Sequence, residues 1–267
     1  MPLDENPYLI PGRWIARGDP MPNDGEPDYV EPILGIVFDL DGTLVVSRHD
    51  FDRMRREVIA TAVRHGADPG ALSPKEPVAR LFEAVRSDLT SRGRPEGDLY
   101  RFEAEANRAI DAIEMEALPR TTVRDGAAPL LAHLSERGYR LGLLTRSAEP
   151  FVRAALARTS LAEYFPYLRT RSAPGPAKPS PEALFLLLSE MGVPPDRALF
   201  VGDHLIDAEC ATRARVHFYA LLPVPGDDNG MTRERFLAAG AAAVAEDLPD
   251  LGRMLGLPAR GPSARPA

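Results

Sequence analysis

The stretch that most limits the fold of this chain is an apolar run at residues 33–38 that ends abruptly in two acids, Asp39 and Asp41. Such a run is typical of a buried parallel strand, and open α/β sheets bind ligands just beyond the carboxyl ends of their strands. Two like charges shielded from water are costly unless a cation neutralises them, and hard oxygen ligands suit Mg²⁺. The sequence therefore predicts a cation-binding site here, with a plain strand and an Asp-Gly turn as the alternative.

Residues 38–44 read Phe-Asp-Leu-Asp-Gly-Thr-Leu, and three more short motifs follow along the chain. They are an apolar run ending at Thr145, a Lys-Pro-Ser-Pro segment beginning at Lys178, and an apolar run ending in Gly-Asp at Asp203 with Asp207 after it. Their order and spacing over residues 34–222 resemble the four motifs of the haloacid dehalogenase superfamily, whose members transfer a phosphoryl group through an aspartyl-phosphate. The chain is identified by this resemblance as a member of that superfamily.

The resemblance implies a role for the residues of the first three motifs. Asp39 would be the nucleophile that attacks phosphorus, a known use of carboxylates. Asp41 would protonate the leaving oxygen and then activate the water that hydrolyses the intermediate. Thr145 would donate a hydrogen bond to a phosphoryl oxygen, and Lys178 would neutralise charge on Asp39 and on the phosphate.

The resemblance also implies a Mg²⁺ site. Asp39, Asp203 and the backbone carbonyl of Asp41 would hold the ion, and Asp207 would be an outer ligand or would orient metal-bound water. Each acid by itself could be a turn residue or a helix cap, which is the usual explanation for Asp near a strand end. Together the acids are better explained as a site.

Several residues near the motifs have two interpretations. Thr43, Arg146 and Ser147 are candidate substrate-binding residues, although the loop that carries Arg146 and Ser147 could equally face solvent. His204 follows the last motif directly and could face the substrate or take a supporting role. The single Cys210 excludes an intramolecular disulfide and favours a small core residue.

Residues 48–120, between the first two motifs, show helical periodicity and no strand pattern. A Ser-x-x-Glu spacing that begins at Ser73 predicts a capping box at the start of one of these helices. Because the superfamily carries an α-helical cap at this point in the chain, we expect a small helical cap domain at 48–120. Its expected connections to the rest of the chain are the segments 45–49 and 119–126.

From residue 124 onward, helix and strand patterns alternate, which is typical of a parallel sheet with helices on both faces. The predicted fold class is therefore α/β, a Rossmann-like parallel sheet core with an inserted small α-helical cap domain. The core would comprise residues 33–47 and 121–257. A proline-rich, irregular N-terminal arm at 1–32 and a flexible tail at 258–267 would flank it.

Charge and hydropathy narrow the choice of partners. The net charge of −7 and an isoelectric point near 5.4 argue against binding to nucleic acid, which requires a basic face. No run approaches the ~18 apolar residues of a membrane span, and the N-terminus lacks the apolar core of a signal peptide. We expect a cytoplasmic protein that binds a small phosphorylated metabolite and no membrane, while the sequence predicts no oligomeric state.

The leading functional hypothesis is a Mg²⁺-dependent phosphatase of a small phosphate monoester, similar to phosphoglycolate phosphatases. The enzymatic alternative is a β-phosphoglucomutase-like phosphomutase, but those mutases commonly carry a His ten residues after the general acid, where this chain has Phe51. Asp50 fits the hydrolase pattern better, whereas Val46 departs from the Asp common in both groups. The third alternative is a non-catalytic binding protein, which would usually have lost a nucleophile, a lysine or a metal ligand, and none is missing here.

Overall fold

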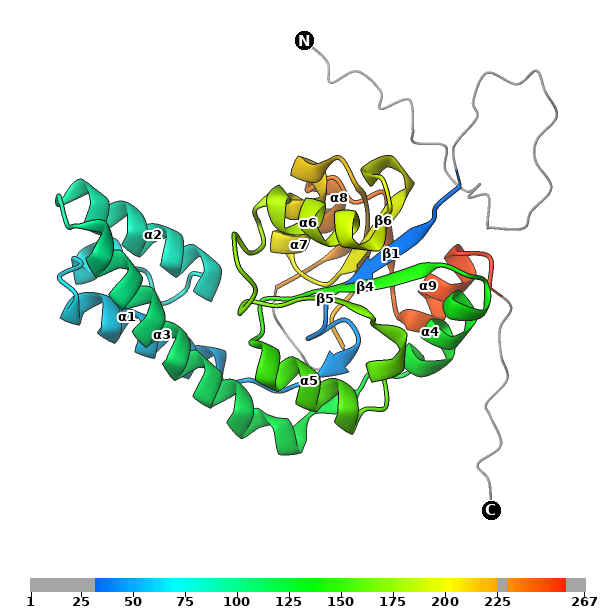
Figure 1. Cartoon of the computed structure of the whole chain (residues 1–267), viewed down its shortest axis with the longest axis horizontal. Helices are drawn as coiled ribbons and strands as arrows, with labels where there is room; N and C mark the ends of the chain where they lie inside the picture. Colours follow the sequence, from blue (N-terminus) through cyan, green and yellow to red (C-terminus); the bar gives the residue numbers. More distant parts are fainter. Residues whose placement is uncertain (1–31, 225–229, 258–267) are drawn as a thin grey trace, which may run out of the picture. The chain divides into compact units, whose positions relative to one another are not determined.

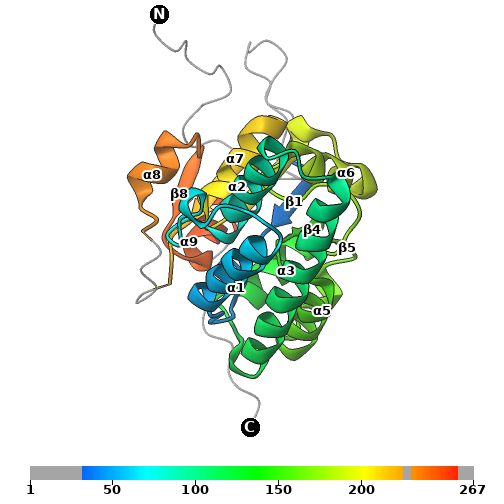
Figure 2. The same cartoon turned by 90° about the vertical axis from the view of Figure 1, so that its left-hand side faces the viewer.

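The computed structural model describes residues 32–224 and 230–257, which form two compact units (Figures 1 and 2). The core unit contains residues 32–46, 122–146, 156–224 and 230–257, and the helical unit contains residues 47–121 and 147–155. Of the N-terminal arm predicted at 1–32, all but Pro32 lies outside the described residues, as does the tail predicted at 258–267.

The core unit is built on a parallel sheet. Within the described residues the strand order is β5-β4-β1-β6-β7-β8. These strands are β1 (Gly35–Phe38), β4 (Arg140–Leu144), β5 (Tyr167–Arg169), β6 (Ala198–Gly202), β7 (His217–Leu221) and β8 (Ala243–Ala245). β1 pairs on both edges and all of its residues are buried, as its uninterrupted apolar pattern predicts. The predicted α/β fold with a parallel sheet is therefore confirmed.

The sheet register brings three strand ends to one level. Phe38 of β1 lies opposite Leu143 of β4 and Val201 of β6. The residues that follow β1, β4 and β6 therefore leave the sheet at the same carboxyl edge. This is the edge at which open parallel sheets bind their ligands.

Helices cover both faces of the sheet (Figure 1). α6 (Pro181–Met191), α7 (Leu205–Ala214) and α8 (Arg233–Ala238) lie on one face, and α4 (Ala127–Glu136) and α9 (Leu248–Met254) lie on the other. Successive residues of a strand point to opposite faces, so each face needs its own cover. Val37 packs in the apolar cluster of α6 and α7, whereas the ring of its neighbour Phe38 meets Phe165 edge-on, with centroids 6.3 Å apart.

The helical unit has an apolar core of its own. It consists of α1 (Phe51–Arg64), α2 (Val78–Ser91) and α3 (Glu96–Ala117), with the first turns of α5 (Glu149–Arg158). The buried residues recur at helical spacing, such as Met54 and Val58 on α1 and Leu81 and Val85 on α2. The α-helical character predicted for this inserted segment is confirmed.

The helix starts in this unit differ from the prediction at one point. Asp50 caps α1 by accepting a first-turn backbone N–H at 2.8 Å. The capping box predicted at Ser73 is wrong, because α2 begins only at Val78, directly after Pro77. The Ser73 hydroxyl instead accepts the Lys75 N–H at 3.3 Å in a local turn. Pro77 fixes the backbone outside the helix, which delays its start beyond the Ser-x-x-Glu pattern.

A short antiparallel ribbon joins the two connections of the inserted segment. β2 (Val45–Val46) pairs with β3 (Thr122–Val123), so both connections leave the core unit side by side. The sequence interpretation missed this ribbon. Strands of two residues are too short to show an alternating pattern, and the two partners are far apart in the chain.

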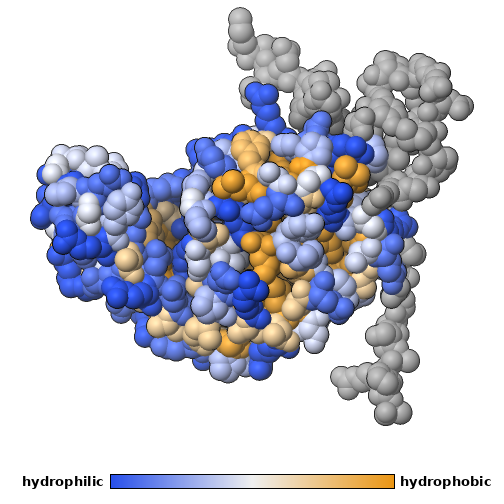
Figure 3. All heavy atoms as spheres, in the orientation of Figure 1, coloured by the Kyte–Doolittle hydropathy of each residue, from blue (hydrophilic) through white to orange (hydrophobic). Residues whose placement is uncertain are grey.

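The surface of the core unit is mixed in character (Figure 3). Apolar side chains gather over α6, where Phe185 and Leu186 are 41% and 42% exposed. These two residues lie on the stripe of α6 opposite the buried Leu184, Leu187 and Leu188. In the part of the chain that the structure describes, no helix combines the length and the apolar character needed to cross a bilayer.

Candidate active site

Asp39, Thr145 and Asp203 each follow a strand of the main sheet at its carboxyl edge. The Asp39 N–H donates to the Val201 carbonyl at 2.9 Å, and the Thr145 N–H donates to the Arg169 carbonyl at 3.0 Å. These bonds continue the sheet's hydrogen-bond ladder one residue beyond β1 and β4. The sheet backbone therefore fixes the positions from which the Asp39 and Thr145 side chains begin.

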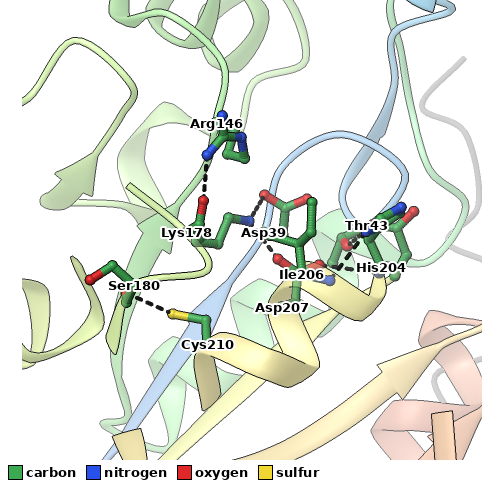
Figure 4. A network of polar contacts seen from close by, with 10 residues as sticks. Asp39, Thr43, Arg146, Lys178, Ser180, His204, Ile206, Asp207 and Cys210 are labelled. Carbon is green, nitrogen blue, oxygen red and sulfur yellow. Dashed lines mark hydrogen bonds and ion pairs between the residues drawn. The ribbon is translucent and has the colours of Figure 1, made fainter. Parts of the chain in front are cut away.

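Lys178 joins two of the carboxylates (Figure 4). Its Nζ lies 2.6 Å from Oδ1 of Asp39 and 2.6 Å from Oδ1 of Asp207. The lysine side chain is only 3% exposed. Burial acts to lower the pKa of Lys178, but the carboxylates of Asp207 and Asp39 outweigh it and hold the pKa above its usual value. The ammonium is therefore a fixed positive charge at the edge of the sheet.

Asp39, Asp203 and Asp207 form an acidic cluster, in which one carboxylate oxygen from each residue lies within 4.8 Å of the others. All three residues are buried. Burial raises the pKa of Asp39 despite the opposing charge of Lys178. Burial and then repulsion from Asp39 and Asp207 raise the pKa of Asp203 well above its usual range. Since Lys178 supplies one positive charge to three carboxylates, full ionisation of the cluster calls for a further cation.

The donor set fits a hard divalent ion. Carboxylate oxygens are the ligands that Mg²⁺ prefers, and the buried acids gain from any cation that offsets their repulsion. Among the described residues, this cluster is the one group of three acidic, His or Cys side chains close enough together to share an ion. Asp41 lies outside this group and is only partly buried, but its charge is near enough to Asp203 to contribute to the raised pKa of that carboxyl.

The loop after β1 brings Gly42 and Thr43 against Asp203. The Thr43 hydroxyl donates to Oδ1 of Asp203 at 3.1 Å. Gly42 has a φ of 80°, and a Cβ at this position would overlap the Asp203 carboxylate. Both the left-handed backbone and the close approach therefore require glycine. The contact of Thr43 with substrate stays a prediction, since its hydroxyl is engaged by Asp203.

The start of α7 holds Asp207 in place. The His204 N–H donates to Oδ2 of Asp207 at 3.1 Å, and the Ile206 N–H donates to Nδ1 of His204 at 3.2 Å. Residues 204 and 207 thus cap the helix reciprocally. This arrangement favours the supporting interpretation of His204 over a direct role in substrate binding.

Arg146 and Ser147 follow Thr145 but belong to different surroundings. The Arg146 guanidinium donates through Nη1 to the backbone carbonyl of Lys178 (Figure 4). Ser147 is buried and belongs to the helical unit, where the next residue, Ala148, donates its N–H to Glu114 at 2.8 Å. The predicted substrate contacts of both residues stay predictions.

The sequence predicted the role of one buried side chain beside the site, Cys210, and missed another, Arg124. Cys210 lies in the core, with its thiol directed to the Ser180 carbonyl at 3.3 Å (Figure 4), as its predicted role as a small core residue requires. Arg124 escaped the sequence interpretation. Its guanidinium donates to the carbonyls of Gly42 and Leu222, a contact that depends on two distant loops and leaves no local pattern.

Comparisons with known proteins show which family the chain resembles. A protein-family model described as haloacid dehalogenase-like hydrolase matches residues 33–215. The phosphoglycolate phosphatase of Rhodospirillum rubrum is 32% identical over 242 residues, which cover 85% of this chain and 92% of that protein. The N-acetylmuramic acid 6-phosphate phosphatase of Pseudomonas aeruginosa is 30% identical over 181 residues, which cover 66% of this chain and 76% of that protein.

The fold also has counterparts among solved structures. The crystal structure of CbbY from Rhodobacter sphaeroides in complex with phosphate superposes with a TM-score of 0.54 at 24% sequence identity. The superposition covers 84% of this chain and 100% of that one. At this identity the likeness shows a shared fold.

Proposed function

This chain belongs to the haloacid dehalogenase-like hydrolases, and on that premise we propose that it is a Mg²⁺-dependent phosphatase of a small phosphate monoester. The observation that carries the proposal is the contact of Lys178 with both Asp39 and Asp207, beside Asp203. A buried ammonium, a carboxylate at a strand end and an acidic cluster are the parts that phosphoryl transfer requires. The two phosphatases named above as relatives support the same reaction class.

In the proposed reaction, an oxygen of Asp39 attacks phosphorus while the bond between phosphorus and the ester oxygen breaks. Asp41 gives its proton to the departing alkoxide. The ionised Asp41 then takes a proton from water, whose oxygen attacks the phosphorus of the aspartyl-phosphate. This second step releases inorganic phosphate and restores both the Asp39 carboxylate and the protonated Asp41.

The remaining motif residues would hold the phosphoryl group. The Lys178 ammonium would offset negative charge on Asp39 and on the phosphoryl oxygens, and its ion pairs with Asp39 and Asp207 support this role. The Thr145 hydroxyl would donate a hydrogen bond to a phosphoryl oxygen from the end of β4. Both residues are buried, so these interactions would act with little competition from water.

Mg²⁺, when bound, would neutralise the charge of the phosphoryl oxygens. Asp39, Asp203 and the backbone carbonyl of Asp41 would hold the ion. Asp207 has one oxygen engaged by Lys178 and the other by the His204 N–H. These contacts support the outer role for Asp207, in which it orients the water ligands of the ion.

We propose a substrate of the phosphoglycolate type. The Rhodospirillum rubrum relative is named for phosphoglycolate and matches more of this chain than the relative named for N-acetylmuramic acid 6-phosphate. We assign the phosphoryl chemistry to the core unit and the selection of the leaving group to the helical unit, as the superfamily resemblance implies. A panel of phosphoglycolate, sugar phosphates and nucleotides tests the proposed preference for phosphoglycolate, and equal turnover of all of them would contradict it.

Hydrolysis of para-nitrophenyl phosphate tests the reaction class directly. We expect phosphate release with Mg²⁺ and none with EDTA. Transfer of the phosphoryl group to a sugar phosphate, rather than to water, would favour the phosphomutase alternative. No turnover of any phosphate ester with Mg²⁺ would favour a binding protein.

A further inference from the structure

Arg124 ties the loop after β1 to the end of β7. The residue follows β3 and is 6% exposed. Its backbone N–H donates to the Leu44 carbonyl at 2.9 Å. Its guanidinium donates through Nη1 to the Gly42 carbonyl and through Nη2 to the Leu222 carbonyl, the latter at 2.6 Å. Arg124 thus binds two carbonyls in the loop after β1 and one carbonyl just after β7.

The Gly42 carbonyl that Arg124 holds lies between two residues of the first motif, the acid Asp41 and the hydroxyl residue Thr43. Gly42 separates Asp41 from Thr43 and packs directly against the Asp203 carboxylate. Thr43 donates to that same carboxylate at 3.1 Å. A shift of the Gly42 peptide would therefore displace Asp41 and loosen Asp203 at the same time.

The positive charge of Arg124 also lies near the acidic cluster, where it acts on Asp203. Burial lowers its pKa, but a guanidinium stays protonated in proteins. Its hydrogen-bond partners in the described residues are backbone carbonyls, and Asp203 and Asp247 are the acids near enough to favour its charged form. Because the carbonyls do not neutralise it, the guanidinium offsets part of the negative charge at Asp203.

We propose that Arg124 is a positioning residue that holds residues 41–43 against Asp203. It sets Asp41 for proton transfer and keeps Asp203 and the Asp41 backbone in place for a divalent cation. The inference rests on the proposed function, in which Asp41 carries the proton. Arg124 acts through the loop, since its guanidinium donates to two backbone carbonyls and not to the carboxylates that react.

The test compares Arg124→Met with a control, Arg140→Met, at an exposed arginine of the core unit. The Arg140 guanidinium also bridges two carbonyls, those of Met191 at 2.9 Å and Gly192 at 2.6 Å, but at the start of β4 and far along the strand from Thr145. Both variants lose an arginine clamp of the core unit. Only Arg124→Met loses the contact with the loop after β1, which carries Asp41.

We expect Arg124→Met to lower kcat about 10- to 100-fold and to weaken Mg²⁺ binding, measured by calorimetry without substrate, by a similar factor. KM should change by less than about threefold, because the contact is not with substrate. Millimolar guanidinium ion should restore part of the lost kcat. Arg140→Met should keep the wild-type kcat and Mg²⁺ affinity.

Arg124→Lys covers the case in which the Met variant does not fold. One ammonium keeps the charge but cannot reproduce the two-pronged contact, so we expect a kcat between those of wild type and Arg124→Met. A folded Lys or Met variant with wild-type kcat and Mg²⁺ affinity overturns the inference. Equal losses in the Arg124 and Arg140 variants, in step with their stabilities, also overturn it.

These measurements distinguish a failure of the proposed function from a failure of the role proposed for Arg124. If the wild-type protein hydrolyses no phosphate ester, the reaction assignment fails, whereas Mg²⁺ calorimetry on the Arg124 and Arg140 variants still tests the clamp. If the wild type is active and Arg124→Met equals it in both measurements, only the role of Arg124 fails.

Discussion

The Asp207 carboxylate lies 2.6 Å from the Lys178 ammonium, which contacts Asp39 at the same distance. Asp207 is itself fixed by the N–H of His204 at the start of α7. Lys178 is therefore held at Asp39 by a residue that is anchored to a helix. In the proposed reaction the ammonium would need no reorganisation before it meets a phosphoryl group. Four predictions follow from this network and its neighbours.

Asp39→Asn should abolish turnover while leaving the fold intact. The amide is nearly isosteric with the carboxylate but is a far weaker nucleophile, and Lys178 keeps its contact with Asp207. We expect kcat for para-nitrophenyl phosphate to fall at least about a thousandfold. The thermal midpoint should stay within about 4 °C of wild type. Near-wild-type hydrolysis by this variant would refute Asp39 as the nucleophile.

Lys178→Met should destabilise the protein in the absence of divalent ions. The substitution leaves the buried Asp39 and Asp207 without their cation, and removal of one partner of a buried ion pair costs about 3–5 kcal/mol. Urea unfolding with EDTA measures the loss. The exposed Lys75→Met is the control and should change the free energy of unfolding by less than about 0.5 kcal/mol. Equal unfolding free energies for the two variants would contradict the prediction.

Asp203→Asn should weaken Mg²⁺ binding. The substitution removes an anionic oxygen from the acidic cluster but retains the shape of the side chain. Calorimetric titration should give an affinity reduced about 10- to 100-fold. Asp196→Asn, an exposed acid of the core unit, should titrate as wild type. An unchanged Mg²⁺ titration for Asp203→Asn would remove this residue from the proposed metal site.

Cys210 should resist alkylation in the folded protein at pH 8. Burial raises the pKa of its thiol to about 12, so the reactive thiolate is only about one part in ten thousand at that pH. The side chain is also inaccessible, with its sulfur against the Ser180 carbonyl. Mass spectrometry after iodoacetamide treatment should detect labelling only in denaturant. Rapid labelling of the folded protein would show that the packing around α7 opens readily.

Several features of the fold could be predicted from local sequence. A strand buried on both faces must be apolar throughout, so residues 33–38 indicated a central parallel strand, and the structure confirms it as β1. Helical periodicity also indicated helices within residues 48–120, where the structure has α1, α2 and α3. These patterns report the burial of single segments, which is a local property of the chain.

Features that depend on two distant segments could not be predicted in this way. The ribbon of β2 and β3, the reciprocal cap of His204 and Asp207, and the clamp of Arg124 all depend on side chains or backbones that meet only after folding. The delayed start of α2 has a different cause, because Pro77 overrode a capping pattern that was locally sound.

The sequence by itself determined that two acids follow a buried central strand, that a helical segment is inserted after it, and where along the chain the four motifs lie. Only the tertiary structure decided which charges meet. Lys178 is 139 residues from Asp39 and 29 from Asp207, and its contacts follow from β6 lying beside β1 and from α7 starting at that edge. Hydropathy patterns carry no information on strand order, whereas an ion pair forms only where the folded backbone brings opposite charges within a few ångströms of each other.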